Sequence, residues 1–168
     1  TPEREASESA SETDSPAAVR MKFIGANPAA KFVGIEPTPA KSNYYVGNDR
    51  SAWRSGVTRY AKVKQENLYP GVDLLFHGNQ SQMEFDLIVA PGGDPNAIRI
   101  AFDGAEKIEV ESGDNLVLHT AAGMLALRKP RVYQESDGVS KEIAATYILE
   151  SAQDSGNSER GAVRFQLA

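Results

Sequence analysis

Two stretches of alternating apolar and polar residues, VDLLFH at 72–77 and QMEFDLIV at 82–89, decide the fold. The alternation is typical of strands that bury one face. Residues 78–81 (GNQS) between them are turn formers, so the two strands are expected to form a hairpin. Both apolar faces must meet one core. A slip of one residue would turn a whole apolar set outward, which restricts the register.

The polar face of this hairpin gathers ionisable side chains. If residues 78–81 form the loop, Asp73 lies directly opposite Asp86, and His77 and Glu84 share their face. Two carboxylates at opposed positions repel each other. The arrangement therefore requires compensation from a cation, from hydrogen bonds or from a shared proton with a raised pKa.

The residues leave three interpretations of this cluster open. In the first, the cluster is structural: a neighbouring strand supplies the cation, with Arg20, Lys22, Arg59 and Arg99 as candidates, or the face is simply solvated. In the second, Asp73, Glu84 and Asp86 hold a divalent ion. Their oxygens favour calcium or magnesium, while His77, with His119 as a further candidate ligand, would permit zinc or manganese. In the third, the carboxylates are catalytic. An ion would then lower the pKa of a bound water, and Glu84 would serve as general base.

The same alternation recurs along the rest of the chain, in short runs separated by Gly, Pro, Asn and Asp. Residues 31–35, 43–46 and 60–64 are expected as separate strands. Two windows, 49–53 and 94–98, are predicted to form single-turn helices. About a dozen short strands joined by hairpin turns predict an all-β antiparallel sandwich, with a closed barrel as the alternative.

Composition sets the protein class. The 168 residues carry a formal charge of -5 and no cysteine, which argues against a nucleic-acid surface and excludes disulfides and thiolate sites. Two histidines exclude a three-histidine metal site. The apolar runs of about six residues are far short of a membrane span. Residues 1–18 are acidic and lack large apolar side chains, which predicts a disordered linker before a domain at 19–168. Residues 1–18 do not resemble a signal peptide, so export would require that one has been removed.

Aromatic residues concentrate between positions 44 and 69, where Tyr45, Trp53, Tyr60 and Tyr69 either form a sugar-stacking or protein-binding patch or cover the core. His119 follows Leu116 and Leu118 and is expected to point away from their face with Asn115 and Val117. A lone histidine in this position is typically a hydrogen-bonded surface residue.

A series of motifs resembles one family, the N-terminal domain found ahead of SBBP-type β-propeller repeats in large exported bacterial proteins. The main motifs are Tyr69-Pro70-Gly71-Val72-Asp73-Leu74, Glu84-Phe85-Asp86-Leu87 and Pro91-Gly92-Gly93-Asp94-Pro95. The flanking matches are Lys41-Ser42-Asn43-Tyr44-Tyr45, Tyr60-Ala61-Lys62-Val63 and Val132-Tyr133-Gln134-Glu135. In the family pattern, a Tyr stands in place of Phe85 and an Ala in place of Gly93. The resemblance extends over about residues 19–168 and carries over no residue-level function.

The resemblance implies a bacterial secreted or cell-surface location, with downstream propeller repeats as partners. A further strand and then the repeats are expected after residue 168. A domain without them would have an unpaired sheet edge and is expected to dimerise by edge pairing. The expected function is a non-catalytic extracytoplasmic module that is structural or binds a partner or glycan. The alternative is a metal-assisted hydrolase of esters or phosphoesters that uses the Asp73, His77, Glu84 and Asp86 cluster.

Overall fold

The computed structural model describes residues 18–78, 82–150 and 162–168. Almost all regular structure in them is β, and the prediction of an all-β antiparallel fold is confirmed by four antiparallel sheets. The chain divides into two compact units, residues 23–100 and residues 1–22 with 101–168. The predicted linker falls almost wholly on residues 1–17, outside the described residues. No helix in the described part of the chain is long and apolar enough to cross a membrane.

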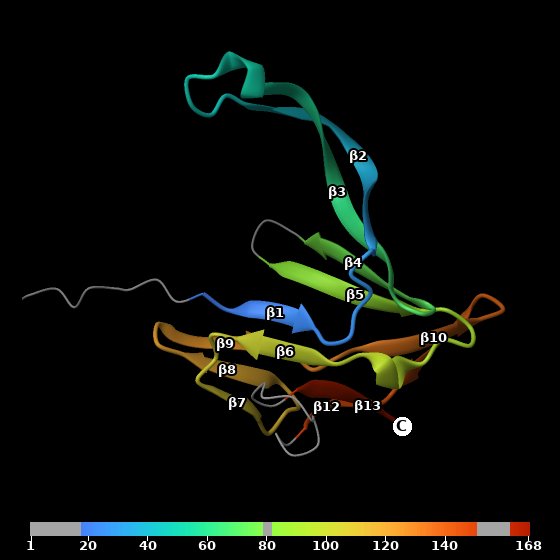
Figure 1. Cartoon of the computed structure of the whole chain (residues 1–168). Helices are drawn as coiled ribbons and strands as arrows, with labels where there is room; N and C mark the ends of the chain where they lie inside the picture. The colour runs from blue at the N-terminus through green and yellow to red at the C-terminus, as the bar shows by residue number, and fades with distance from the viewer. Residues whose placement is uncertain (1–17, 79–81, 151–161) are drawn as a thin grey trace, which may run out of the picture. The chain divides into compact units, whose positions relative to one another are not determined.

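The unit at residues 23–100 contains one four-stranded sheet in the order β2-β3-β4-β5 (Figure 1). Its strands are β2 (Lys31–Tyr44), β3 (Arg54–Tyr69), β4 (Val72–Gly78) and β5 (Met83–Val89). Two 3-10 turns, η1 (Arg50–Ala52) and η2 (Pro95–Ala97), occupy the predicted helical windows. Asp49 and Asp94 cap them by accepting hydrogen bonds from the backbone N–H groups of Ser51 and Asn96. The buried residues are Leu68, Tyr69, Val72, Leu74, Ile98 and Ile100.

The second unit is built on shorter strands. One sheet has the order β1-β6-β13-β12, another the order β7-β8-β9, and β10 pairs with β11. The strands are β1 (Arg20–Phe23), β6 (Ile100–Asp103), β7 (Lys107–Val110), β8 (Leu116–Thr120), β9 (Gly123–Leu127), β10 (Val132–Ser136), β11 (Val139–Ile143), β12 (Ala145–Leu149) and β13 (Val163–Leu167). Three successive residues of β8, Leu116–Leu118, are buried, so this central strand is covered on both faces. Val117, expected on the face opposite Leu116 and Leu118, is therefore buried on that second face and not directed to solvent.

The 23–100 unit is inserted between β1 and β6, which are neighbours in one sheet. The ends of the insert are joined by a hydrogen bond from the Ile24 N–H to the Arg99 carbonyl, 2.8 Å long. Tyr69 also ties them together, because its hydroxyl donates to the Ile24 carbonyl at 2.8 Å. Burial raises the pKa of Tyr69, which is 4% exposed. The phenol thus remains a neutral donor at the base of the insert.

The pairing of β2 with β3 corrects the strand boundaries expected from the sequence. The run at 31–35 and the first two residues of the run at 43–46 belong to one 14-residue strand that contains Pro37 and Pro39, and residues 45–46 lie beyond its end. Prolines are tolerated there because β2 is an edge strand, whose outward N–H groups have no partner strand to bond. The run at 60–64 lies inside the 16-residue β3. Together the two strands form a much longer hairpin than the sequence predicted.

Beyond the β3–β4 pairing, this hairpin continues as a two-stranded ribbon. The pairing of β3 with β4 ends at Val63↔Phe76, whereas the pairing of β3 with β2 continues to Tyr44↔Arg54. We call residues 35–62 the arm and residues 44–54 the tip. Figure 1 shows the arm extending beyond the ends of β4 and β5 of the same unit. Gly34 lies at the base of the arm, where the Tyr60 ring covers it so closely that an added Cβ would lie 2.4 Å from ring carbons.

Candidate functional site

The carboxylates of the β4–β5 hairpin share one face as predicted, but the predicted register is wrong. The observed pairs are Asp73↔Ile88, Leu75↔Asp86 and His77↔Glu84, a shift of two residues. A shift of two leaves every side chain on its predicted face, so alternation alone does not distinguish the two registers. The observed register avoids two directly opposed carboxylates and places a histidine opposite a glutamate, which favours it electrostatically.

Asp73 stabilises strand β3 through two contacts. Its Oδ2 lies 2.8 Å from Lys64 Nζ, and its Oδ1 accepts the Asn67 N–H at 2.8 Å. Asn67 has a φ of 54° at an irregularity of β3, so the carboxylate satisfies a backbone donor that the ladder leaves out. The Lys64 ammonium and the Asn67 N–H hold the pKa of Asp73 below its usual value. The neighbouring-strand cation that the first interpretation required is thus Lys64, a residue outside the candidates considered.

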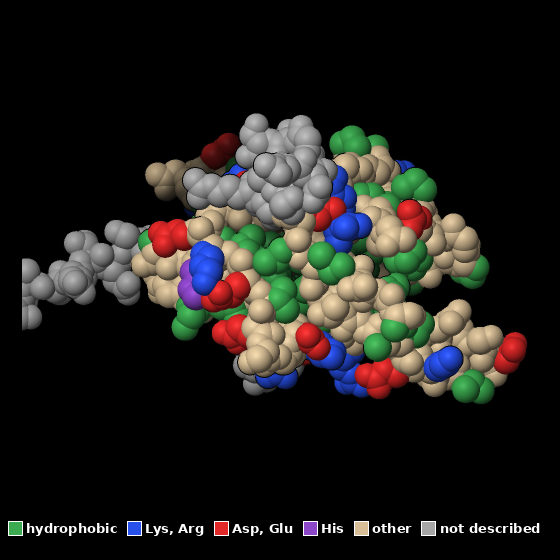
Figure 2. All heavy atoms as spheres, turned by 90° about the horizontal axis from the view of Figure 1, so that it is seen from below, with side chains coloured by type: hydrophobic (Ala, Val, Ile, Leu, Met, Phe, Trp, Pro, Cys, Tyr) green, Lys and Arg blue, Asp and Glu red, His purple; other side chains and the backbone are tan. Residues whose placement is uncertain are grey.

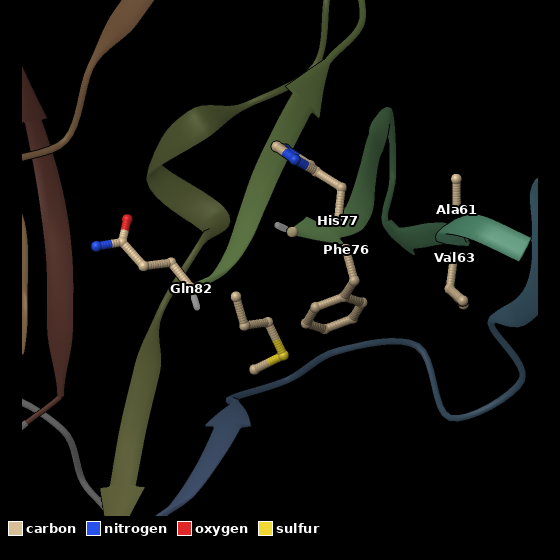
Figure 3. Close-up of a pocket in the computed structure, with 7 residues that line it drawn as sticks. Ala61, Val63, Phe76, His77 and Gln82 are labelled. Carbon is tan, nitrogen blue, oxygen red and sulfur yellow. The ribbon is translucent and has the colours of Figure 1, made fainter. Parts of the chain in front are cut away.

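The rest of the cluster is organised around His77. Its Nε2 lies 2.9 Å from Asp86 Oδ2, and its Nδ1 lies 3.9 Å from Glu84 Oε2. Figure 3 shows His77 and Phe76 on opposite sides of β4, as successive residues of a strand must be. Among the described residues, no three His, Asp or Glu side chains are grouped as metal ligands. The arrangement is an imidazole between two carboxylates, which is suited to pairing charges across two strands.

An open depression of about 470 Å³ lies beside this cluster (Figure 3). Its lining residues are Ala61, Val63, Phe76, His77, Gly78, Gln82 and Met83. Val63, Phe76 and Met83 supply an apolar floor, and the polar groups are one imidazole and one amide. This lining lacks a second titratable group that could work with His77 as an acid–base pair.

His119 forms a separate surface cluster in the other unit. Its Nε2 lies 2.6 Å from Glu109 Oε1, and Lys107 also pairs with that carboxylate. Lys107 and His119 hold the pKa of Glu109 below its usual value. Each described histidine therefore faces a carboxylate of its own sheet. Figure 2 shows acidic and basic side chains interspersed on the face it draws, as expected for such pairs.

Of the four aromatic candidates, two have structural roles and two meet at the tip. Tyr69 is a buried hydrogen-bond donor at the base of the insert, and Tyr60 covers Gly34 at the base of the arm. Tyr45 and Trp53 meet at the tip, with ring centroids 5.1 Å apart and planes tilted by 57°. This separation and tilt are favourable for an aromatic pair. In this ring pair Tyr45 is exposed and Trp53 is half-buried.

The tip is an exposed loop with several polar contacts of its own. Trp53 Nε1 donates to the Gly47 carbonyl at 3.2 Å, and the Asp49 carboxylate accepts both the N–H and the hydroxyl of Ser51. Those bonds to Ser51 lower the pKa of Asp49. Next to the ring pair, Tyr44 is 55%, Tyr45 58% and Val46 79% exposed. Apolar side chains are thus presented to solvent on a loop that polar contacts hold in one conformation.

The aromatic pattern of the sequence indicated Tyr45 and Trp53 but not the cations beside them. The Arg50 guanidinium carbon lies 5.5 Å from the Trp53 ring centroid, a cation–π contact. Arg54 Nη1 donates to the carbonyls of Ser51 and Trp53, both at 3.1 Å. Their positions, three residues before and one residue after the single tryptophan, were a usable sequence signal. The resulting cluster combines two rings with two guanidinium groups at the end of a ribbon.

The motifs that carried the family resemblance mostly occupy structural positions. Pro70 and Gly71 form the two-residue turn between β3 and β4, and Gly71 has the positive φ of 73° that a type II turn requires. Gly93 packs on this turn, since an added Cβ would lie 2.8 Å from the Gly71 carbonyl oxygen. Together with Tyr69 and Asp73, these residues stabilise the insert.

Comparison with known proteins finds one match. A family model described as a domain of unknown function, DUF7948, matches residues 1–168. No curated protein and no solved structure matches the chain. That description names no activity, so inferences about function depend on the geometry above.

Proposed function

We propose that this chain, which belongs to the DUF7948 family of domains of unknown function, is a non-catalytic interaction module that binds its partner through the tip. The observation that carries the proposal is the ring pair of exposed Tyr45 and half-buried Trp53 at the end of a two-stranded arm. An isolated two-stranded ribbon is marginally stable in water. A ribbon that ends in exposed apolar side chains is best explained by a partner that covers them.

The preorganised loop supports this reading. The Trp53 indole and the Asp49 cap hold the loop before any partner arrives. A preformed loop loses little conformational entropy on binding, so more of the contact energy appears as affinity. Aromatic and arginine side chains are also the residues that most often dominate binding energy in interfaces.

The contacts of the ionisable clusters also support a non-catalytic role. Asp73 is engaged by Lys64 and by the Asn67 backbone, and its carboxylate therefore has a structural task. His77 and His119 each contact a carboxylate that is open to solvent. A catalytic group is normally set in a concave site that excludes water, and the depression beside His77 is open.

The wider setting is part of the proposal. The motif resemblance to domains that precede β-propeller repeats supports a secreted or cell-surface protein of bacterial type. In that setting, the partner of the tip is either another domain of the same polypeptide or a surface glycan or protein.

The proposal is tested on the full chain with the variants Trp53→Ala and Tyr45→Ala. Tyr133→Ala is the matched control, because Tyr133 is 64% exposed on β10 in the other unit. Biolayer interferometry would measure binding to a panel of envelope polysaccharides and to purified propeller-repeat protein. We expect at least one of these to bind, and the tip variants to lose about tenfold or more in affinity at unchanged melting temperature. Binding that ignores both tip substitutions would contradict the proposal. So would ester hydrolysis that depends on Asp73 or Glu84.

A further inference from the structure

The arm is basic in an otherwise acidic chain. Residues 35–62 hold five basic and two acidic side chains, a formal charge of +3, whereas the remaining residues hold 13 basic and 21 acidic, a charge of -8. The basic side chains of the arm are Lys41, Arg50, Arg54, Arg59 and Lys62. Such charge segregation indicates attraction of an anionic partner toward the arm and its repulsion from the rest of the chain.

The two tip guanidinium groups are set beside the rings rather than dispersed in solvent. The Arg50 guanidinium carbon lies 5.5 Å from the Trp53 ring centroid, and Arg54 donates to the Ser51 and Trp53 carbonyls. The nearest acid, Asp49, directs its carboxylate to the Ser51 N–H and hydroxyl. The tip therefore presents apolar ring faces and planar guanidinium groups on one small surface.

We propose, as a deepening of the function above and dependent on it, that the ligand of the tip is an acidic polysaccharide, a chain of pyranose rings that bear carboxylates. The apolar C–H face of a pyranose can stack on Tyr45 or Trp53. Arginine guanidinium groups match carboxylates in bidentate geometry. One surface therefore fits both features of such a sugar.

The features of the arm favour a polymer over a single sugar. The tip is convex and exposed, so one residue of sugar would bury little area. Lys41 and Arg59 continue the positive charge along the ribbon behind the tip. A polymer that runs along the arm engages several weak contacts at once, and its avidity exceeds the affinity of each contact.

Two other anionic polymers fit less well. An extended acidic peptide would bind by adding a strand to the open edge of β2, but Pro37 and Pro39 remove N–H donors from that edge. Duplex DNA carries one charge per about 1.7 Å, a higher charge density than that of a polysaccharide with one carboxylate per sugar ring, so the acidic remainder of the chain repels DNA more strongly. Both polymers therefore serve as probes that distinguish the proposal.

The experiment uses the full chain, polygalacturonate as the acidic probe, and dextran, poly-glutamate and duplex DNA as comparison probes. Trp53 is the only tryptophan, so its fluorescence reports binding at the tip directly. The double variant Arg50→Ala/Arg54→Ala removes the cations and keeps the rings. Arg131→Ala/Lys141→Ala is the matched control, because it removes two exposed cations from the other unit.

We expect polygalacturonate to change Trp53 fluorescence saturably, with binding that weakens as salt rises. The arginine double variant should bind about tenfold or more weakly, while the control pair keeps nearly full affinity. Equal binding of dextran, or tip-dependent binding of poly-glutamate or DNA in preference, would overturn the acidic polysaccharide and leave an interaction module in place. If neither these probes nor the panel in the preceding test binds through the tip, both proposals fail.

Discussion

At the scale of single residues, the ionisable side chains that suggested chemistry perform structural work. Asp73 satisfies a backbone donor in β3 and an ammonium on the same strand. Tyr69, expected in a binding patch or in the core, bonds the two ends of the insert together. Asp73 thus stabilises an irregular part of the backbone, and Tyr69 stabilises the closure of the insert. Neither role can be inferred from the type of side chain alone.

The Asp73 contacts predict a pH-dependent contribution to stability. The pKa of Asp73 is lower in the folded chain than its usual 3.8, so its contribution is present above about pH 4 and is lost as pH falls through the folded value. We expect Asp73→Asn to lower the free energy of unfolding by about 1 kcal/mol at pH 7, because the carboxylate is partly exposed. The difference from the parent should vanish near pH 2.

Urea unfolding at several pH values measures this difference. Glu142→Gln on β11 is the control and should change the free energy of unfolding by less than about 0.5 kcal/mol. A pH-independent difference for Asp73→Asn would show that the charge of Asp73 is not the source of its contribution.

Tyr69 makes the second residue-scale prediction. Tyr69→Phe keeps the buried ring and removes the hydroxyl that donates to the Ile24 carbonyl. We expect a loss of about 1–2 kcal/mol, because a part-buried acceptor loses its donor. Tyr133→Phe, on a side chain that is 64% exposed, should be nearly neutral in the same thermal and urea unfolding experiments. Equal effects of the two variants would contradict the assigned role.

At the scale of elements, the arm is a two-stranded part of its sheet and differs in this from β4. β4 lies between two strands, whereas both strands of the arm have a single partner. The apolar side chains Tyr44, Val46 and Val57 remain exposed on it. Its conformation therefore depends on local bonds and turn geometry instead of a core.

This difference predicts the order of local opening. Backbone amides at 40–45 and 55–61 should exchange with deuterium at least about tenfold faster than those at 72–77, because opening the arm exposes little buried surface. Hydrogen-exchange mass spectrometry on the full chain measures these peptides. Equal protection of the arm and β4 would indicate that the arm is covered in solution.

Several of these elements could be predicted from the sequence, and others could not. The caps Asp49 and Asp94 act within two residues of the turns they stabilise, and both turns were predicted in place. Alternation correctly assigned the faces of β4 and β5 but left the register open by two residues. The alternation is also interrupted around Pro37 and Pro39, which predicted a break between two strands. Only the strand pairing shows that β2 is an edge strand. Among the site residues, Tyr45 and Trp53 were found by their type. Lys64 was missed because its contact with Asp73 depends on the pairing of β3 with β4.

At the scale of the whole molecule, one unit of the chain is inserted in the sequence between β1 and β6 of the other. The insert contains its own buried residues, and its ends are hydrogen-bonded to each other. A segment with a closed base and a core of its own has the features of an independent folding unit.

This closure predicts that residues 23–100 fold when expressed alone. We expect far-ultraviolet circular dichroism of antiparallel sheet and a cooperative urea transition. The fragment should be less stable than the full chain, because its core is small. The Tyr69→Phe fragment should be weaker still, since its base is then held by fewer bonds. A fragment with no cooperative transition would show that the insert depends on its host.

The insertion between β1 and β6 also has an evolutionary consequence. A segment that leaves and re-enters a scaffold at adjacent points behaves as a cassette, because its length and content can vary without displacing the strands on either side. Selection could therefore diversify the recognition end of such proteins while the scaffold stays constant. Protein engineers could exploit the same entry point to graft foreign ribbons onto this host.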